Sequence, residues 1–84
     1  MSLVELYYSD TCADCHSVRT MLIELLPKGI TFKEVNALQG EGLERAKHLG
    51  ISSVPAIALD GELMLVGRID RDDIKYLLDT ITAV

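Results

Sequence analysis

The sequence predicts an α/β fold in the order β-α-β-α-β-β-α, a four-stranded mixed sheet with helices on both faces. Apolar runs typical of strands alternate with segments of helical period, and strands joined through helices favour parallel pairing. The dipeptide Asp60–Gly61, between two apolar runs, predicts a tight turn and therefore an antiparallel pair. With 84 residues, the chain is expected to form a single domain over residues 1–84.

The first half of the chain is expected to fold as strand, helix and strand. Residues 3–8 (LVELYY) are apolar almost throughout, which is typical of a strand covered on both faces. Residues 30–37 (ITFKEVNA) have alternating apolar positions and predict the second strand. Between them lies a helix that Pro27 and Gly29 end. Its apolar positions, spaced three and four apart, are Cys15, Val18, Leu22 and Leu25.

The second half is expected to fold as helix, hairpin and helix. Residues 41–50 predict a short helix that a terminal glycine ends. Residues 54–59 (VPAIAL) and 62–67 (ELMLVG) predict the two strands of the hairpin. Asp70 is expected to cap the last helix. The apolar stripe of that helix consists of Ile74, Leu77, Leu78 and Ile81.

The composition disfavours several classes of function. Apolar residues make up 49% and charged residues 25% of the chain, as in an ordinary folded domain. The formal net charge of −5 disfavours nucleic acid and anionic membrane surfaces as partners. No apolar run approaches the roughly 20 residues of a membrane span, and MSLVELYYSD lacks the basic and apolar regions of a signal peptide. We therefore expect a cytoplasmic protein.

The segment DTCADCH, residues 10–16, contains both cysteines of the chain and is compatible with several kinds of chemistry. Cys-x-x-Cys-His is the pattern for attachment of a c-type haem, but that class needs export and a largely helical chain. A structural zinc site needs four ligands, so the cysteines and His16 would still require His48 from the next helix. Two structural thiols in a packed helix start are a further alternative. We expect no bound metal or organic cofactor.

A redox-active dithiol fits these positions best. Cys12 is expected at the first turn of the helix, where unpaired backbone N–H groups and the helix dipole favour a thiolate. Helical residues three apart have Cβ atoms about 5–6 Å apart, so a small adjustment closes a Cys12–Cys15 disulfide. Cys15 shares the apolar stripe and is expected to face the core. We therefore predict that Cys12 attacks a substrate disulfide and Cys15 resolves the mixed disulfide.

A strand, a Cys-x-x-Cys helix and a later Ser-Val-Pro before a hairpin resemble the thioredoxin/glutaredoxin superfamily over residues 4–81. The resemblance implies a thioredoxin-like fold, a monomer, and thiol–disulfide oxidoreductase activity on protein disulfides. It also implies that the Val54–Pro55 peptide bond is cis and faces the dithiol, with the backbone of Val54 pairing with an extended substrate. The alternative is that Pro55 merely begins an edge strand.

The sequence departs from both main branches of this superfamily. Its size is similar to that of glutaredoxins, but the motif is Cys-Ala-Asp-Cys, no lysine shortly precedes it, and Gly67 stands alone where glutaredoxins have two glycines. The chain also lacks the tryptophan and the Gly-Pro of the thioredoxin motif, and Leu6 occupies the strand position where thioredoxins bury an aspartate. Residues that hold glutathione in relatives are not evident. The resemblance therefore favours a flavoprotein of the thioredoxin-reductase kind as electron donor, and glutathione less.

Charged residues beside the cysteines are expected to modulate their chemistry. Asp14 lies between the cysteines and Asp10 just before Cys12, and negative charge disfavours a thiolate. We therefore expect a less acidic Cys12, and a more reducing couple, than in an oxidising member of the superfamily. His16, one turn after Cys12, either offsets this charge and takes part in proton transfer or is simply a solvated side chain. The arginines expected to be solvated are Arg19, Arg68 and Arg71.

Two rival functions remain open at this point. A glutathione-coupled glutaredoxin would use the same two cysteines with a different electron donor. A non-catalytic adaptor of the same fold would instead hold a soft metal ion between Cys12 and Cys15. Neither the physiological client protein nor the reduction potential follows from the sequence.

Overall fold

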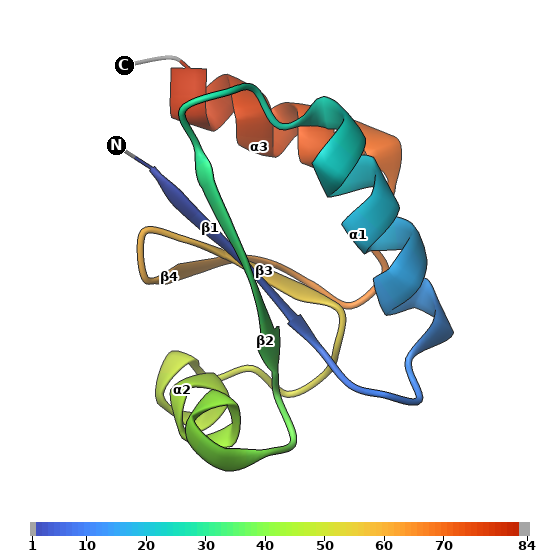
Figure 1. Ribbon diagram of the computed structural model, residues 1–84, viewed down its shortest axis with the longest axis vertical. Helices are drawn as coiled ribbons and strands as arrows, with labels where there is room; N and C mark the ends of the chain where they lie inside the picture. The colour runs from blue at the N-terminus through green and yellow to red at the C-terminus, as the bar shows by residue number, and fades with distance from the viewer. Residues whose placement is uncertain (1, 83–84) are drawn as a thin grey trace.

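A computed structural model describes residues 2–82, and over them the chain forms a four-stranded mixed sheet covered on both faces by helices (Figure 1). Helices α1 and α3 lie side by side on one face, and α2 covers the other (Figure 1). This confirms the predicted fold class and element order. The strands are β1 (Leu3–Tyr8), β2 (Thr31–Asn36), β3 (Ala56–Leu59) and β4 (Glu62–Val66). The helices are α1 (Ala13–Leu25), α2 (Gly40–Leu49) and α3 (Arg71–Thr82).

The strand order across the sheet is β2-β1-β3-β4, with β1 parallel to β2 and antiparallel to β3. Strands β3 and β4 form the predicted antiparallel hairpin. At its turn Asp60 and Gly61 have φ of 50° and 83°, as a tight hairpin turn requires. The expectation of parallel pairing through a helix is wrong for β2 and β3, which are not neighbours and run in opposite directions. Helix α2 lies near the end of the sheet where β2 finishes, so β3 starts from that end (Figure 1).

The segment before β3 also differs from the prediction. Val54 and Pro55 were expected within a strand, but β3 begins only at Ala56. Proline has no backbone N–H to donate to a sheet, and here its carbonyl oxygen accepts a hydrogen bond from the Gly67 N–H at 2.9 Å. Since β3 is an inner strand, the alternative that Pro55 begins an edge strand is wrong. None of the helices formed by residues 2–82 is long and apolar enough to cross a membrane.

The helix ends follow from local hydrogen bonds. Asp70 caps α3 as predicted, because its Oδ1 accepts the Asp73 N–H and Asp73 Oδ2 accepts the Asp70 N–H, both at 3.0 Å. Helix α2 ends at Gly50, which adopts φ of 76° and donates its N–H to the last turn. The N-cap of α2 is Gln39, whose side chain makes no capping hydrogen bond.

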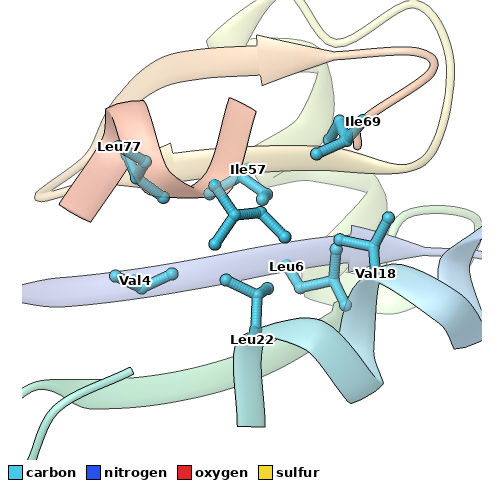
Figure 2. Close-up of a cluster of buried hydrophobic side chains, with 8 residues drawn as sticks. Val4, Leu6, Val18, Leu22, Ile57, Ile69 and Leu77 are labelled. Atoms are coloured by element: carbon cyan, nitrogen blue, oxygen red, sulfur yellow. The ribbon is translucent and has the colours of Figure 1, made fainter. Parts of the chain in front are cut away.

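The two faces of the sheet have different cores. The face toward α1 and α3 buries large aliphatic side chains, which interlock in Figure 2. They are Val4, Leu6, Val18, Leu22, Ile57, Ile69, Ile74 and Leu77. The face toward α2 buries one large hydrophobic side chain, Tyr7, among the alanines Ala37, Ala46, Ala56 and Ala58.

Small residues let α2 lie very close to the sheet. A Cβ atom added to Gly42 would overlap the backbone carbonyl of Asn36 at the end of β2. Ala46, one turn further along α2, is 4% exposed. Close approach brings the α2 backbone near the sheet but leaves little apolar side-chain surface to bury between them.

An ion pair with one buried partner joins α2 to β1. The Glu5 side chain is 4% exposed, and Arg45 Nη2 donates to its two carboxylate oxygens at 2.9 and 2.8 Å. Arg45 Nε donates to the Tyr7 hydroxyl oxygen at 3.2 Å. The hydrogen bonds to Tyr7 and to Glu5 raise the pKa of Arg45 above its ordinary value. The guanidinium therefore stays charged, and the buried carboxylate is always compensated.

Candidate active site

The Cys12–Cys15 disulfide lies where β1 leads into α1, with the two Cα atoms 5.4 Å apart. Cys12 is the N-cap of α1, one position before the first turn that the sequence indicated, and its backbone is extended. Its Sγ accepts the Cys15 N–H at 3.1 Å, and its own N–H is donated to the Ser9 carbonyl at 3.2 Å. A sulfur that accepts an N–H of the first helical turn is also placed to be stabilised as a thiolate.

The two sulfurs differ in their access to solvent. Cys15 is 4% exposed and lies on the same side of α1 as Val18 and Leu22, which confirms that it faces the core. Cys12 is partly exposed. An incoming disulfide can therefore reach Cys12 from solvent, whereas Cys15 is covered by the rest of the domain.

A cavity of about 260 Å³ opens beside the disulfide. Its walls come from the end of β1, the loop that follows, the start of α1 and β2. His16 lines this cavity, while Asp14 is exposed on the first turn of α1 and does not line it. The lining residues are Leu6, Tyr8, Ser9, Asp10, Cys12, Cys15, His16, Arg19 and Glu34.

A second cavity of about 220 Å³ connects the cysteine loop to the segment before β3. Ser9, three residues before Cys12, and Val54 both line it, together with Leu38, which is 64% exposed. The Val54–Pro55 peptide bond is cis, as the resemblance implies. Because Ser9 and Val54 line the same cavity, Val54 lies close to the loop that leads into the cysteines.

The zinc ligands considered from the sequence are not brought together. His48 lies on α2 and lines a different cavity, with Glu44 and Gly61 among its neighbours. Within the part of the chain that the structure describes, no group of three or more His, Cys, Asp or Glu side chains is arranged to hold a metal ion.

An ion pair in the cavity beside the disulfide was not predicted from the sequence. Arg19, expected to be solvated, lies with its Nε 2.7 Å from Oε1 of Glu34 on β2. The position of Arg19 near the cysteines could have been predicted, because Arg19 lies four residues after Cys15 on the same side of the helix. Arg71 and Arg68 are exposed as predicted, and Arg71 Nη2 lies 3.5 Å from Oε2 of Glu24.

Comparison with known proteins identifies the family. The thioredoxin domain family model matches residues 3–79. A mutant thioredoxin from Halobacterium salinarum NRC-1 superimposes with a TM-score of 0.77 at 24% identity, over 99% of this chain and 76% of that one. Thioredoxin O2 from Arabidopsis thaliana, in the oxidized state, gives a TM-score of 0.79 at 21% identity, over 96% and 75%. A search of curated proteins found no match.

At these identities the solved structures show a shared fold, and the family match covers nearly the whole described chain. The disulfide at the start of α1 supplies the redox-active pair that such a domain needs. The chain therefore belongs to the thioredoxin domain family and is a dithiol–disulfide oxidoreductase.

Proposed function

We propose that the protein reduces disulfide bonds in other proteins, with Cys12 as the attacking group and Cys15 as the resolving group. The Cys12 thiolate attacks one sulfur of the substrate disulfide, a Cys12–substrate bond forms, and the other substrate sulfur leaves as a thiolate. Cys15 then loses its proton and attacks Cys12 Sγ, which releases the second substrate sulfur and forms the Cys12–Cys15 disulfide. Two electrons and two protons pass in total from the protein to the substrate.

The difference between the two cysteines carries this assignment. Cys12 is partly exposed and its Sγ accepts the Cys15 N–H, whereas Cys15 is 4% exposed. The exposed sulfur is the one that a large substrate reaches and the one whose thiolate is stabilised. The buried sulfur reaches only its neighbour three residues away, which suits a resolving role.

We further propose that Val54 and Pro55 border the substrate site. The second cavity extends from Ser9 to Val54 and exposes the side chain of Leu38, so it suits the apolar residues that flank a substrate disulfide. Leu38→Ser is expected to raise the KM for a protein disulfide and to leave the reaction with a small aromatic disulfide unchanged. Equal effects on the two substrates would argue against this site.

The electron donor distinguishes the two enzymatic alternatives. We propose a flavoprotein of the thioredoxin-reductase kind, and the test is reduction of insulin with NADPH and either thioredoxin reductase or glutathione with glutathione reductase. Turnover with thioredoxin reductase supports the proposal, and turnover with glutathione alone supports the glutaredoxin alternative. No turnover with either donor, together with stoichiometric zinc or copper in the reduced protein, supports the adaptor alternative.

Trapping tests the roles of the two cysteines. Cys15→Ser is expected to accumulate a mixed disulfide with insulin, because the intermediate forms but cannot be resolved. The matched variant Cys12→Ser is expected to trap none. The reverse pattern would exchange the two roles.

We place this activity in a monomer in the cytoplasm. Both cysteines belong to the redox pair, so no structural disulfide requires an oxidising compartment. Sedimentation equilibrium checks the first point, and alkylation of thiols in intact cells followed by mass analysis checks the second. A dimer, or a fully oxidised pool, would contradict these assignments.

Asp14 and His16 are proposed to tune the dithiol. Both are exposed near Cys12, where a negative charge disfavours its thiolate and a positive charge favours it. Asp14→Asn is expected to make the Cys12 thiol more acidic, as measured by the ultraviolet absorbance of its thiolate during a pH titration. An unchanged or weaker acidity would exclude this role, and an unchanged titration in His16→Ala would leave His16 as a solvated side chain.

A further inference from the structure

The cavity beside the disulfide contains a charged pair that has no role in the two exchange steps described above. Arg19 on α1 and Glu34 on β2 meet there, with Nε and Oε1 2.7 Å apart. Both side chains line the same cavity as Cys12 and Cys15. They are 43% and 36% exposed, so the pair is partly withdrawn from solvent and still in contact with it.

The register of the sheet explains why a carboxylate lies at this place. Leu6 and Glu34 are partners on the parallel strands β1 and β2, so their side chains point to the same face, which α1 covers. The strand that leads into the cysteines contributes Leu6 and Tyr8 to the cavity wall, and neither is a carboxylate. The carboxylate comes instead from the neighbouring strand.

The second exchange step requires a proton acceptor near Cys15. Its thiol must lose a proton before the sulfur attacks Cys12 Sγ, yet Cys15 is 4% exposed and burial disfavours the thiolate. The cavity of about 260 Å³ has space for several waters. Each occupies about 30 Å³ in the liquid, and the charged lining offers them hydrogen-bond partners.

We propose that Glu34 accepts the proton of Cys15 through water in this cavity, an inference that rests on the proposed function. The Cys15 S–H bond breaks and its proton moves to the Glu34 carboxylate, while a bond forms from Cys15 to Cys12 Sγ. The bond from Cys12 to the substrate breaks, and its electron pair leaves on the substrate sulfur. Glu34 then passes the proton to solvent or to the departing thiolate. Arg19 is a positioning residue that holds the carboxylate toward the cavity.

Other ionisable groups face the same cavity and are competitors for this role. They are Tyr8 from β1, Asp10 from the following loop, and His16 from α1. Asp10 and His16 are exposed. Among the described residues Asp10 makes no ion pair, so Glu34 is the cavity carboxylate that an arginine holds.

The test separates the two exchange steps by stopped flow, with the aromatic disulfide dithiobis(nitrobenzoate) as the probe. The first thionitrobenzoate released reports attack by Cys12, and the second reports attack by Cys15. In Glu34→Gln we expect the second release to slow by about a hundredfold at neutral pH, the low end of what a positioned general base contributes. Its pH profile should change as well, while the first release keeps its rate.

Matched variants make the result specific. Glu24→Gln removes the same charge from the exposed pair with Arg71 and is expected to behave as wild type in both steps. Glu34→Asp should restore part of the second rate, and Arg19→Gln should slow the second release less than Glu34→Gln does. A second release in Glu34→Gln with the wild-type rate and pH profile overturns the proposal, as does a loss confined to Asp10→Asn or His16→Ala.

Failure of the underlying function has a different signature. If Cys15 does not resolve, wild type itself releases a single thionitrobenzoate. If Glu34→Gln does not fold, its first release is abnormal too. The second release in Arg19→Gln is then measured instead. An unchanged second release in Arg19→Gln would in that case overturn the proposal.

Discussion

The two faces of the sheet are stabilised by different kinds of side-chain contact. Toward α1 and α3, eight large aliphatic side chains form a continuous core. Toward α2, four alanines surround Tyr7, and the Glu5–Arg45 pair adds a polar contact. Burial of apolar area contributes about 25 cal/mol per Å², so the first face carries most of the stability.

The location of the site gives this difference a functional meaning. Both cysteines belong to the start of α1, the helix anchored by the large core. The proposed substrate cavity runs between that start and the α2 side, where Leu38 and Val54 lie. The reacting sulfurs are thus positioned by the face with the larger core, whereas the proposed substrate cavity borders the less strongly packed one.

The largest expected effect is loss of a core leucine on α1. Leu22→Ala removes a fully buried side chain and should lower the free energy of unfolding by about 2–5 kcal/mol. Leu49→Ala makes the same change on α2, where the side chain is only partly buried, and should cost about half as much. Urea unfolding measures both, and an equal or larger loss for Leu49→Ala would break the comparison.

A smaller effect is expected from the ion pair on the α2 face. Arg45→Met leaves the buried Glu5 carboxylate without its cation, at a cost of about 1–3 kcal/mol, moderated because Arg45 itself is half exposed. Arg71→Met breaks the exposed pair with Glu24 and should change the free energy of unfolding by no more than about 0.5 kcal/mol. Similar values for the two variants would show that the Glu5–Arg45 pair does not fasten α2.

The pH dependence of this pair has a defined sign. Hydrogen bonds to Tyr7 and Glu5 raise the pKa of Arg45 in the folded state. A raised pKa on a basic group gives stability that is present below the unfolded-state value and lost only as the pH rises through the folded-state one. The difference between wild type and Arg45→Met should therefore stay constant from neutral to moderately alkaline pH. A decline over that range, in urea unfolding repeated at each pH, would contradict the assignment.

The smallest effect concerns the helix caps. Gln39 has an extended backbone at the N-cap of α2 but no capping hydrogen bond, so Gln39→Ser should stabilise the domain by about 0.5–1 kcal/mol. Asp70→Ala removes the existing cap of α3 and should destabilise by about 1 kcal/mol. Native-state hydrogen exchange should show the Gln39→Ser gain in α2 amides. A gain spread equally over all helices would mean that α2 does not open on its own.

Patterns within single elements were enough to predict much of the fold. The spacing of Cys15, Val18 and Leu22 predicted the buried side of α1, and Asp60–Gly61 predicted the hairpin. The motif around Cys12 predicted the redox pair that the structure contains. These predictions succeeded because each depends on residues close together in the chain.

What the sequence did not reveal depends on contacts between distant segments. The direction of β3 follows from the position of α2 near the end of the sheet where β2 finishes, which no local pattern reports. The buried Glu5 carboxylate is paired with Arg45, 40 positions later in the chain. Glu34 enters the cysteine cavity only through the register of β1 and β2. Each requires a pairing that a single sequence leaves open.

The most direct test of the oxidoreductase assignment is an equilibrium redox titration of the purified protein, with alkylated thiols counted by mass. We expect a reversible two-electron couple between Cys12 and Cys15, at about −270 mV for a thioredoxin-like reductant. A value of about −200 to −230 mV would move the protein toward glutaredoxins without removing the dithiol chemistry. If no reversible Cys12–Cys15 disulfide formed at any potential, the oxidoreductase assignment would be contradicted.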